Sequence, residues 1–315
     1  MVGRIGSKGQ RYKSSVGSKL FDFLNYLLCI FLVLLCIYPF LYMFSLSVSN
    51  YVSIAFGDVR LFPKGFHMVS YQDILRRTMV LRGYFNTILY TVVNTFLVIM
   101  LSSMGGFVLA ERKFFFKRSM SFFFLIMMFF SGGMIPVFLW IRNLGLLDTI
   151  WAIVLPTAVG PFYIFLFRVY IKENVPESLK ESVRIDGGND FVVYMRIVLP
   201  LIKPIIATIG LFAAVAMWNS FVPPLIYLHD SKKYPLTLLL RQIVIVGDFG
   251  GYIGAFAGRV IASPEDTADA ELWTFGYMKS IKMAMTMITV IPIVLVYPFA
   301  QRYFVRGILI GSLKE

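Results

Sequence analysis

The residue types that carry most protein chemistry are sparse and scattered in this sequence of 315 residues. Its two histidines, His67 and His229, lie in separate predicted loops with no cysteine or acidic cluster beside either, so we expect no metal site. The sequence contains neither a Gly-x-x-x-x-Gly-Lys-[Ser/Thr] phosphate loop nor a Gly-x-Ser-x-Gly nucleophile motif. We therefore predict that the chain is not an enzyme and has no catalytic residue or cofactor of its own.

Ionisable groups of both signs gather in one short segment, 177–190. It contains Glu177, Lys180, Glu181, Arg184, Asp186 and Asp190. Each such charge costs roughly 2.5 to 3.5 kcal/mol at the centre of a bilayer, so together they exclude a membrane-spanning position for this segment.

The residues around these charges predict two short helices joined by a glycine turn. Pro176 and Glu177 suit a first helical turn, and Gly187 with Gly188 ends the helix because glycine adopts positive φ freely. Asn189 then caps a second helix, whose apolar face would carry Phe191, Met195, Val198 and Leu199. Composition alone leaves two interpretations open: a hairpin resting on a membrane surface, or a docking element for a partner protein.

The elements that position this segment are predicted to be membrane-spanning helices. The chain is 58% hydrophobic and 15% charged, with a mean hydropathy of +0.76, which is outside the range of soluble domains. A span needs about 20 apolar residues to cross a hydrocarbon core of about 30 Å. Six segments qualify, so we predict an all-α integral membrane protein with spans at about 25–47, 84–110, 119–141, 150–167, 201–228 and 281–301.

Basic residues predict the orientation of these spans. The segment before the first span contains Arg4, Lys8, Arg11, Lys13 and Lys19, and the connection 111–118 is also basic. Positive segments stay in the cytoplasm, so both termini and the 177–200 loop should face inward. The expected organisation is a cytoplasmic segment 1–22, a membrane domain 23–305 with loops at about 172–204 and 229–280, and a cytoplasmic tail 306–315. Orientation and anionic membrane lipid account for the net charge of +13, so we expect no nucleic-acid partner.

The predicted spans contain neutral polar residues, but four long stretches have no Asp, Glu, Lys, Arg or His: 84–109, 119–141, 150–167 and 283–301. Ion-coupled carriers usually need such groups at depth, so a self-powered carrier is disfavoured. The neutral residues either link helices by hydrogen bonds or line a path for a polar solute. Candidates for such a path are Asn86, Asn94, Trp218 and Asn219.

The order of residues in the charged segment carries a family resemblance. "ESVRIDGG" followed by "IVLP" resembles the E-A-A, D-G, I-x-L-P cytoplasmic loop of bacterial ABC importer permeases, and the matching positions are Glu181, Asp186, Gly187, Ile197, Leu199 and Pro200. Ser182 and Val183 replace the usual alanines, and Gly188 replaces the residue after the glycine. "WNSFVPPLIYL" (218–228) and "QRYFVRGILIGSLKE" (301–315) are similar to the carbohydrate-uptake branch, specifically to the smaller permease of heterodimeric oligosaccharide importers.

The resemblance implies a fold, a function and partners. Such a permease has the type I importer fold with six spans and lies in the bacterial cytoplasmic membrane. It pairs with a second permease and two ATPase subunits that use ATP and Mg, and an extracytoplasmic solute-binding protein delivers the sugar. The loop containing Glu177, Glu181, Ser182, Gly187 and Gly188 would be the coupling helix held by an ATPase.

Three alternatives remain beside an oligosaccharide importer of this family. The first is an importer of the same family for another solute, such as a polyol. The second is a self-contained secondary carrier or channel, and the third is a membrane-bound enzyme. The absence of an intramembrane ion relay disfavours the second, and the absence of a catalytic constellation disfavours the third.

Overall fold

The computed structural model describes residues 16–246 and 267–312, and these residues contain helices and turns but no strand. Three helices are long and apolar enough to cross a membrane, and three further helix pairs, each bent at a short break, raise the number of spans to as many as six. The predicted all-α class with up to six spans is thereby confirmed.

The elements follow one another in a simple order. The first part of the chain forms α1 (Val16–Ser47), α2 (Tyr51–Ala55), α3 (Val69–Leu75), α4 (Thr78–Ala110), α5 (Lys117–Phe129) and α6 (Met134–Asn143). The middle forms α7 (Ile150–Ala158), α8 (Pro161–Asn174), α9 (Glu177–Ile185), α10 (Asp190–Val193), the π-helical turn η1 (Tyr194–Val198) and α11 (Leu199–Leu201). The last part forms α12 (Lys203–Trp218), α13 (Val222–Tyr227), the 3-10 turn η2 (Ser231–Lys233), α14 (Leu236–Arg241), the π-helical turn η3 (Gln242–Val246) and α16 (Thr267–Ser312).

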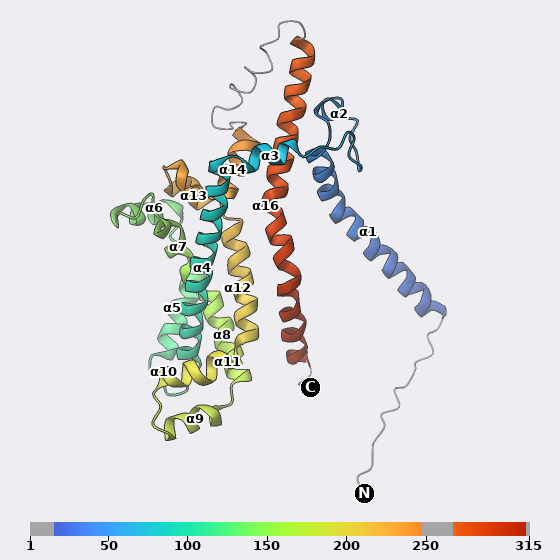
Figure 1. The fold of residues 1–315 in the computed structure, drawn as a ribbon. Coiled ribbons are helices and arrows are strands. Elements are labelled where there is room, and N and C mark those ends of the chain that lie inside the picture. The colour runs from blue at the N-terminus through green and yellow to red at the C-terminus, as the bar shows by residue number, and fades with distance from the viewer. Residues whose placement is uncertain (1–15, 247–266, 313–315) are drawn as a thin grey trace.

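Helix α4 is the centre of the larger helix group and packs against α7, α8 and α12 (Figure 1). Gly106 allows the close approach of α8, because a Cβ there would lie 2.5 Å from the Cβ of Phe167 and 2.9 Å from the backbone nitrogen of Arg168. Phe107, Phe167 and Val198 belong to the apolar core that forms between α4, α8 and the helices after the α9 turn. This packing fixes the position of the charged segment relative to the spans.

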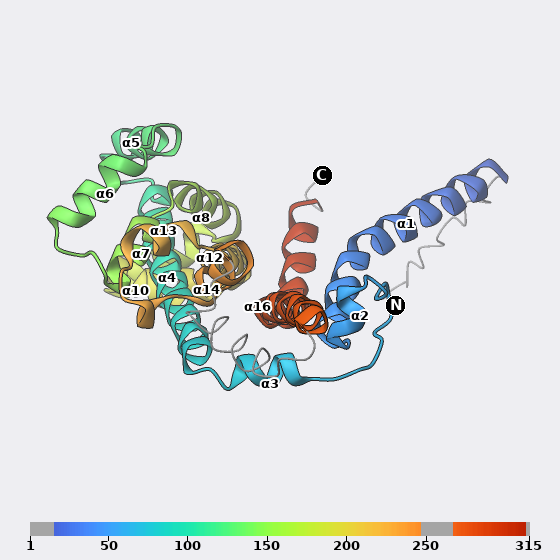
Figure 2. The ribbon, with the colours of Figure 1, turned by 90° about the horizontal axis from the view of Figure 1, so that it is seen from above.

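Helix α16 joins the α4 group to the N-terminal helices. It packs against α12 on one side and against α1, α2 and α3 on the other, and lies between them when seen from above (Figure 2). Leu46, Ile74, Tyr277 and Ile281 form part of a second apolar core at this junction. The hydroxyls of Ser70 and Ser280, 2.8 Å apart, link α3 to α16 inside it. This junction lies at the end of α4 opposite α9 (Figure 1).

Two parts of the molecule project from these cores. Helix α1 extends away from the rest of the chain and is exposed over most of its length. Helices α5 and α6 project at the opposite edge (Figure 2), and α5 has no buried residue. Both are strongly apolar, so they present large apolar surfaces to lipid or to other subunits.

Several predicted boundaries differ from the structure. The predicted span 119–141 is interrupted, because α5 and α6 meet at 112° across a break that includes Gly133 with φ +82°. The predicted span 201–228 is helical as α12 only to Trp218 and continues as the short α13. Helix α1 begins at Val16, within the predicted cytoplasmic segment 1–22. Helix α16 begins at Thr267 and ends at Ser312, so it includes part of the predicted loop 229–280 and most of the tail 306–315. Residues 1–15, 247–266 and 313–315 lie outside the described residues.

Candidate functional site

The charged segment forms α9, and a buried ion pair attaches it to the end of α4. The side chain of Lys180 is only 3% exposed, and its Nζ lies 2.8 Å from Oε1 of Glu111 and 2.9 Å from Oε2 of Glu177. Glu111 follows the last residue of α4, so this contact joins two elements distant in sequence. The hydrogen bond from Lys180 is the largest cause that lowers the pKa of Glu177. A buried ammonium needs such partners, since an isolated buried charge is costly.

Arg184 extends the same network to α10. Its Nη2 lies 2.7 Å from Oε2 of Glu111 and 2.9 Å from Oδ1 of Asp190. The bond to Glu111 raises the pKa of Arg184 above its usual value, so the guanidinium stays charged. One carboxylate, Glu111, therefore accepts from both cations of α9 and fixes this helix against the end of α4.

Sequence reasoning did not assign a role in the site to Glu111, Lys180 or Arg184. A usable signal was present, because Glu177, Lys180 and Arg184 are spaced i, i+3 and i+7 and so lie on one face of a helix. The partner, Glu111, could not be found this way because it comes from a different connection.

The predicted glycine turn is confirmed. Gly187 has φ +85°, and the amide of Gly188 donates to the carbonyl of Val183 at 2.8 Å. A Cβ on Gly188 would lie 2.6 Å from Cγ1 and 2.8 Å from the carbonyl oxygen of Val183, whereas a Cβ on Gly187 would meet open space. The two positions thus require glycine for different reasons: position 187 has a positive φ, and position 188 is in close contact with Val183. Asn189 caps α10 as predicted, since its Oδ1 accepts from the amide of Val192.

The predicted apolar face of the second helix is wrong in part. Phe191 and Met195 are 58% and 47% exposed, whereas Val198 is fully buried. The cause is the π-helical turn η1, in which the amide of Leu199 donates to the carbonyl of Tyr194, five residues earlier. The extra residue in this turn shifts the register, so the side chains expected on one face point in two directions.

Four exposed apolar side chains lie on the helices of this hairpin. They are Leu179 (42% exposed), Ile185 (85%), Phe191 (58%) and Met195 (47%), and we call them the apolar face of the hairpin. The other predicted site residues are close by: Glu181, Ser182, Asp186 and Pro200 are exposed, and Ile197 and Leu199 are half-buried. The hairpin is thus held to the end of α4 by ion pairs and exposes four apolar side chains, a feature typical of interaction sites.

Each of the four candidates for a solute path makes a hydrogen bond within the chain. The side-chain amide of Asn86 donates to the carbonyls of Lys232 and Tyr234, and the carboxamide oxygen of Asn94 accepts from Thr157 at 2.8 Å. Trp218 is 8% exposed and donates to the carbonyl of Thr289. These three side chains therefore link elements of the chain, and their role in a path remains a prediction.

Asn219 is exposed and donates to the carbonyl of Val215 in its own helix, so it does not link elements. Trp218 also borders an apolar cavity of about 210 Å³ between α4, α12 and α16, together with Thr91 and Tyr297.

These features define a class. The chain is a multi-span helical membrane protein whose most polar element, outside the spans, is attached to the end of α4 by ion pairs and exposes apolar side chains. Residues 99–310 match the family model described as "Binding-protein-dependent transport system inner membrane component", and the chain belongs to this family. The expected ABC importer permease fold and a bacterial, multi-pass membrane location are thereby confirmed, and members of this family act in general with a second permease, ATPases and a binding protein.

Individual relatives agree with this assignment. The chain is 37% identical to the polygalacturonan/rhamnogalacturonan transport system permease protein YtcP of Bacillus subtilis, over 94% of this chain and 99% of the relative. It is 26% identical to the arabinooligosaccharides transport system permease protein AraQ of Halalkalibacterium halodurans, over 73% and 72% of the two chains. A crystal structure of a bacterial ABC transporter involved in the import of the acidic polysaccharide alginate matches with a TM-score of 0.83 and 30% identity, covering 92% of this chain and 98% of that one.

Proposed function

We propose that this chain is the non-catalytic translocation subunit of an ATP-driven oligosaccharide importer, and that the hairpin of α9, α10 and η1 is its coupling element. The observation that carries the proposal is the apolar face of the hairpin on a helix fixed by Glu111. A docked ATPase subunit would push on α9. The ion pairs of Lys180 and Arg184 with Glu111 would transmit this displacement directly to the end of α4. ATP and Mg would be bound by the ATPase subunits.

The proposed orientation has α9, both termini and the C-terminal end of α16 in the cytoplasm. Basic residues before α1 and after α4 support it. The C-terminal end of α16 lies at the same end of the molecule as α9 (Figure 1), as a shared cytoplasmic side requires. A second permease would cover part of the apolar surface of α1, α5 and α6, and a solute-binding protein would dock at the opposite end.

We propose an acidic oligosaccharide as the solute. YtcP is described as a transporter of polygalacturonan and rhamnogalacturonan, and the alginate importer carries an acidic polysaccharide. Polygalacturonan is built from galacturonic acid, so polygalacturonan and the acidic polysaccharide alginate both carry carboxylates. Arginines predicted to lie outside the membrane, Arg60, Arg76, Arg77 and Arg82, would favour the approach of an anion.

The coupling role predicts what happens when apolar residues of the apolar face of the hairpin are replaced by polar ones. In the assembled importer, Ile185→Ser combined with Phe191→Ser should reduce the ATPase subunits that copurify at least tenfold, because two exposed apolar contacts are removed. The second permease should still copurify. Phe62→Ser is the matched control, since Phe62 is 82% exposed at the other end of the molecule. Unchanged ATPase recovery with the double variant would contradict the coupling assignment.

A further inference from the structure

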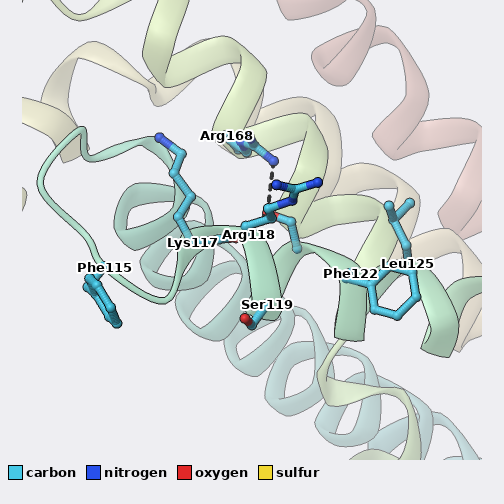
Figure 3. Close-up of a pocket in the computed structure, with 8 residues that line it drawn as sticks. Phe115, Lys117, Arg118, Ser119, Phe122, Leu125 and Arg168 are labelled. Carbon is cyan, nitrogen blue, oxygen red and sulfur yellow. Dashed lines mark hydrogen bonds between the residues drawn. The ribbon is translucent and has the colours of Figure 1, made fainter.

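A second polar site lies beside the hairpin, between the start of α5 and the second half of α8. It is an open pocket of about 720 Å³ (Figure 3). Three cationic side chains line it, Lys117, Arg118 and Arg168, together with Ser119 and Ser121. The residues that line it include no acidic side chain. The pocket therefore carries a concentrated positive charge of its own.

Two of the three cations, Arg168 and Lys117, have hydrogen-bond partners that are neutral. Nη1 of Arg168 donates to Oγ of Ser121 at 3.1 Å. Nζ of Lys117 donates to the carbonyl oxygens of Ala110 and Glu111, at the end of α4. The carboxylate of Glu111, which is nearby in the chain, already accepts from Lys180 and Arg184. A negatively charged ligand would complement the charge of this pocket.

The rest of the lining is apolar and leads along α5. Phe115 is 89% exposed, Phe122 is 65% exposed and Leu125 is 41% exposed. Figure 3 shows Lys117 and Arg118 at the start of α5, Arg168 of α8 beside them, and the side chains of Phe122 and Leu125 further along α5. Since α5 is the first half of a candidate span, we expect the pocket to lie near the membrane surface. A ligand that fits has an anionic head and an apolar tail.

We propose that this pocket binds the headgroup phosphate of an anionic phospholipid, with an acyl chain against Phe122 and Leu125. Basic residues next to a spanning helix attract anionic lipid, and exposed aromatic side chains such as Phe115 are typical of the interface. An acidic segment of another subunit would satisfy the cations but would leave the adjoining apolar wall without a matching group. Through Lys117 the bound lipid would also steady the end of α4 that holds α9.

The test uses the purified importer complex in detergent and native mass spectrometry of bound lipid. Titration with phosphatidylglycerol should give saturable binding that phosphatidylcholine does not give. Arg118→Gln with Arg168→Gln should weaken the phosphatidylglycerol binding by about 30-fold, at about 1 kcal/mol for each cation. Arg142→Gln, near the end of α6, is the matched control and should bind as the wild type. Equal binding by the double variant and the wild type would overturn the proposal.

Two further measurements keep the result unambiguous. Arg118→Gln alone should still weaken binding, about fivefold, and its side chain is exposed, so a failure of the double variant to assemble does not end the test. A benzophenone amino acid in place of Phe115 should crosslink to lipid in native membranes. A crosslink to another subunit instead, or displacement of phosphatidylglycerol by inorganic phosphate at equal concentration, would overturn the lipid assignment.

Discussion

At the scale of single residues, the hairpin of α9, α10 and η1 depends on two glycines and one carboxylate. Gly187 supplies a positive φ, Gly188 allows a contact with the backbone of Val183, and Glu111 binds both cations of α9. None of these roles involves contact with a solute. Substitutions here should therefore change how motion is transmitted rather than what is transported.

Gly187→Ala and Gly188→Ala should both lower the amount of solute transported per ATP hydrolysed in proteoliposomes. A non-glycine residue in the left-handed region costs about 1 to 2 kcal/mol, which is what Gly187→Ala would impose. Gly188→Ala should be worse, because the clash at 2.8 Å is with a backbone oxygen that cannot rotate away. Gly187→Trp should uncouple transport from hydrolysis. Wild-type stoichiometry in all three variants would contradict the role of the turn.

Glu111→Gln should destabilise the protein strongly. It leaves the buried Lys180 with Glu177 as its remaining carboxylate and takes one ion pair from Arg184. Breaking one partner of a buried pair costs about 3 to 5 kcal/mol, so the unfolding temperature in detergent should fall by several degrees. Glu181→Gln is the control, because Glu181 is exposed on the same helix and should leave the temperature almost unchanged. Similar temperatures for the two variants would argue against the network.

At the scale of elements, a similar carboxylate joins the connections at the other end of the molecule. Asp148, between α6 and α7, has φ +58° and pairs with Nζ of Lys233 at 2.5 Å. Its Oδ1 also accepts from the amides of His229 and Asp230. The bond from Lys233 is the main cause that lowers the pKa of Asp148 to about 2. The α6–α7 connection is thus locked to the segment after α13 by one side chain.

This lock predicts a dependence of stability on pH. Because the pKa of Asp148 is lower in the folded state, its contribution is complete above the ordinary value of 3.8 and is lost as pH falls from there toward about 2. Unfolding temperatures of the wild type and Asp148→Asn, measured from pH 5 to pH 2.5, should converge as the pH falls. Asn also tolerates positive φ, so the variant tests the charge and not the turn. A constant difference across this range would contradict the assignment.

At the scale of the whole molecule, the chain has the form of one part of an assembly. Helices α1, α5 and α6 extend from the cores with apolar surfaces, and the stretches 84–109, 119–141, 150–167 and 283–301 contain no Asp, Glu, Lys, Arg or His. We therefore expect the energy for transport to enter from outside the chain, and the hairpin is the element that we propose receives it.

Reconstitution should show this dependence directly. Proteoliposomes with both permeases, the ATPase subunits and the solute-binding protein should take up an oligogalacturonide only when ATP is supplied on the ATPase side. A neutral oligosaccharide of equal length should stimulate the ATPase much less, because it lacks the carboxylates of the proposed solute. Uptake without ATPase subunits would instead identify a self-contained carrier. Equal stimulation by both sugars would contradict the proposal that the solute is acidic, but it would not contradict the proposal that the chain belongs to an ATP-driven importer.

The sequence by itself determined the helical membrane class, the exclusion of segment 177–190 from the bilayer, the glycine turn and the family. These follow from local properties: hydropathy over a window, the cost of inserting charge, and the dihedral freedom of Gly187. The tertiary structure alone decided that Glu111 holds Lys180 and Arg184, that η1 turns Phe191 and Met195 outward, and that Lys117 and Arg168 share a pocket. The physical reason is that ion pairs and pockets join residues from separate connections, whose proximity depends on how α4, α5 and α8 pack.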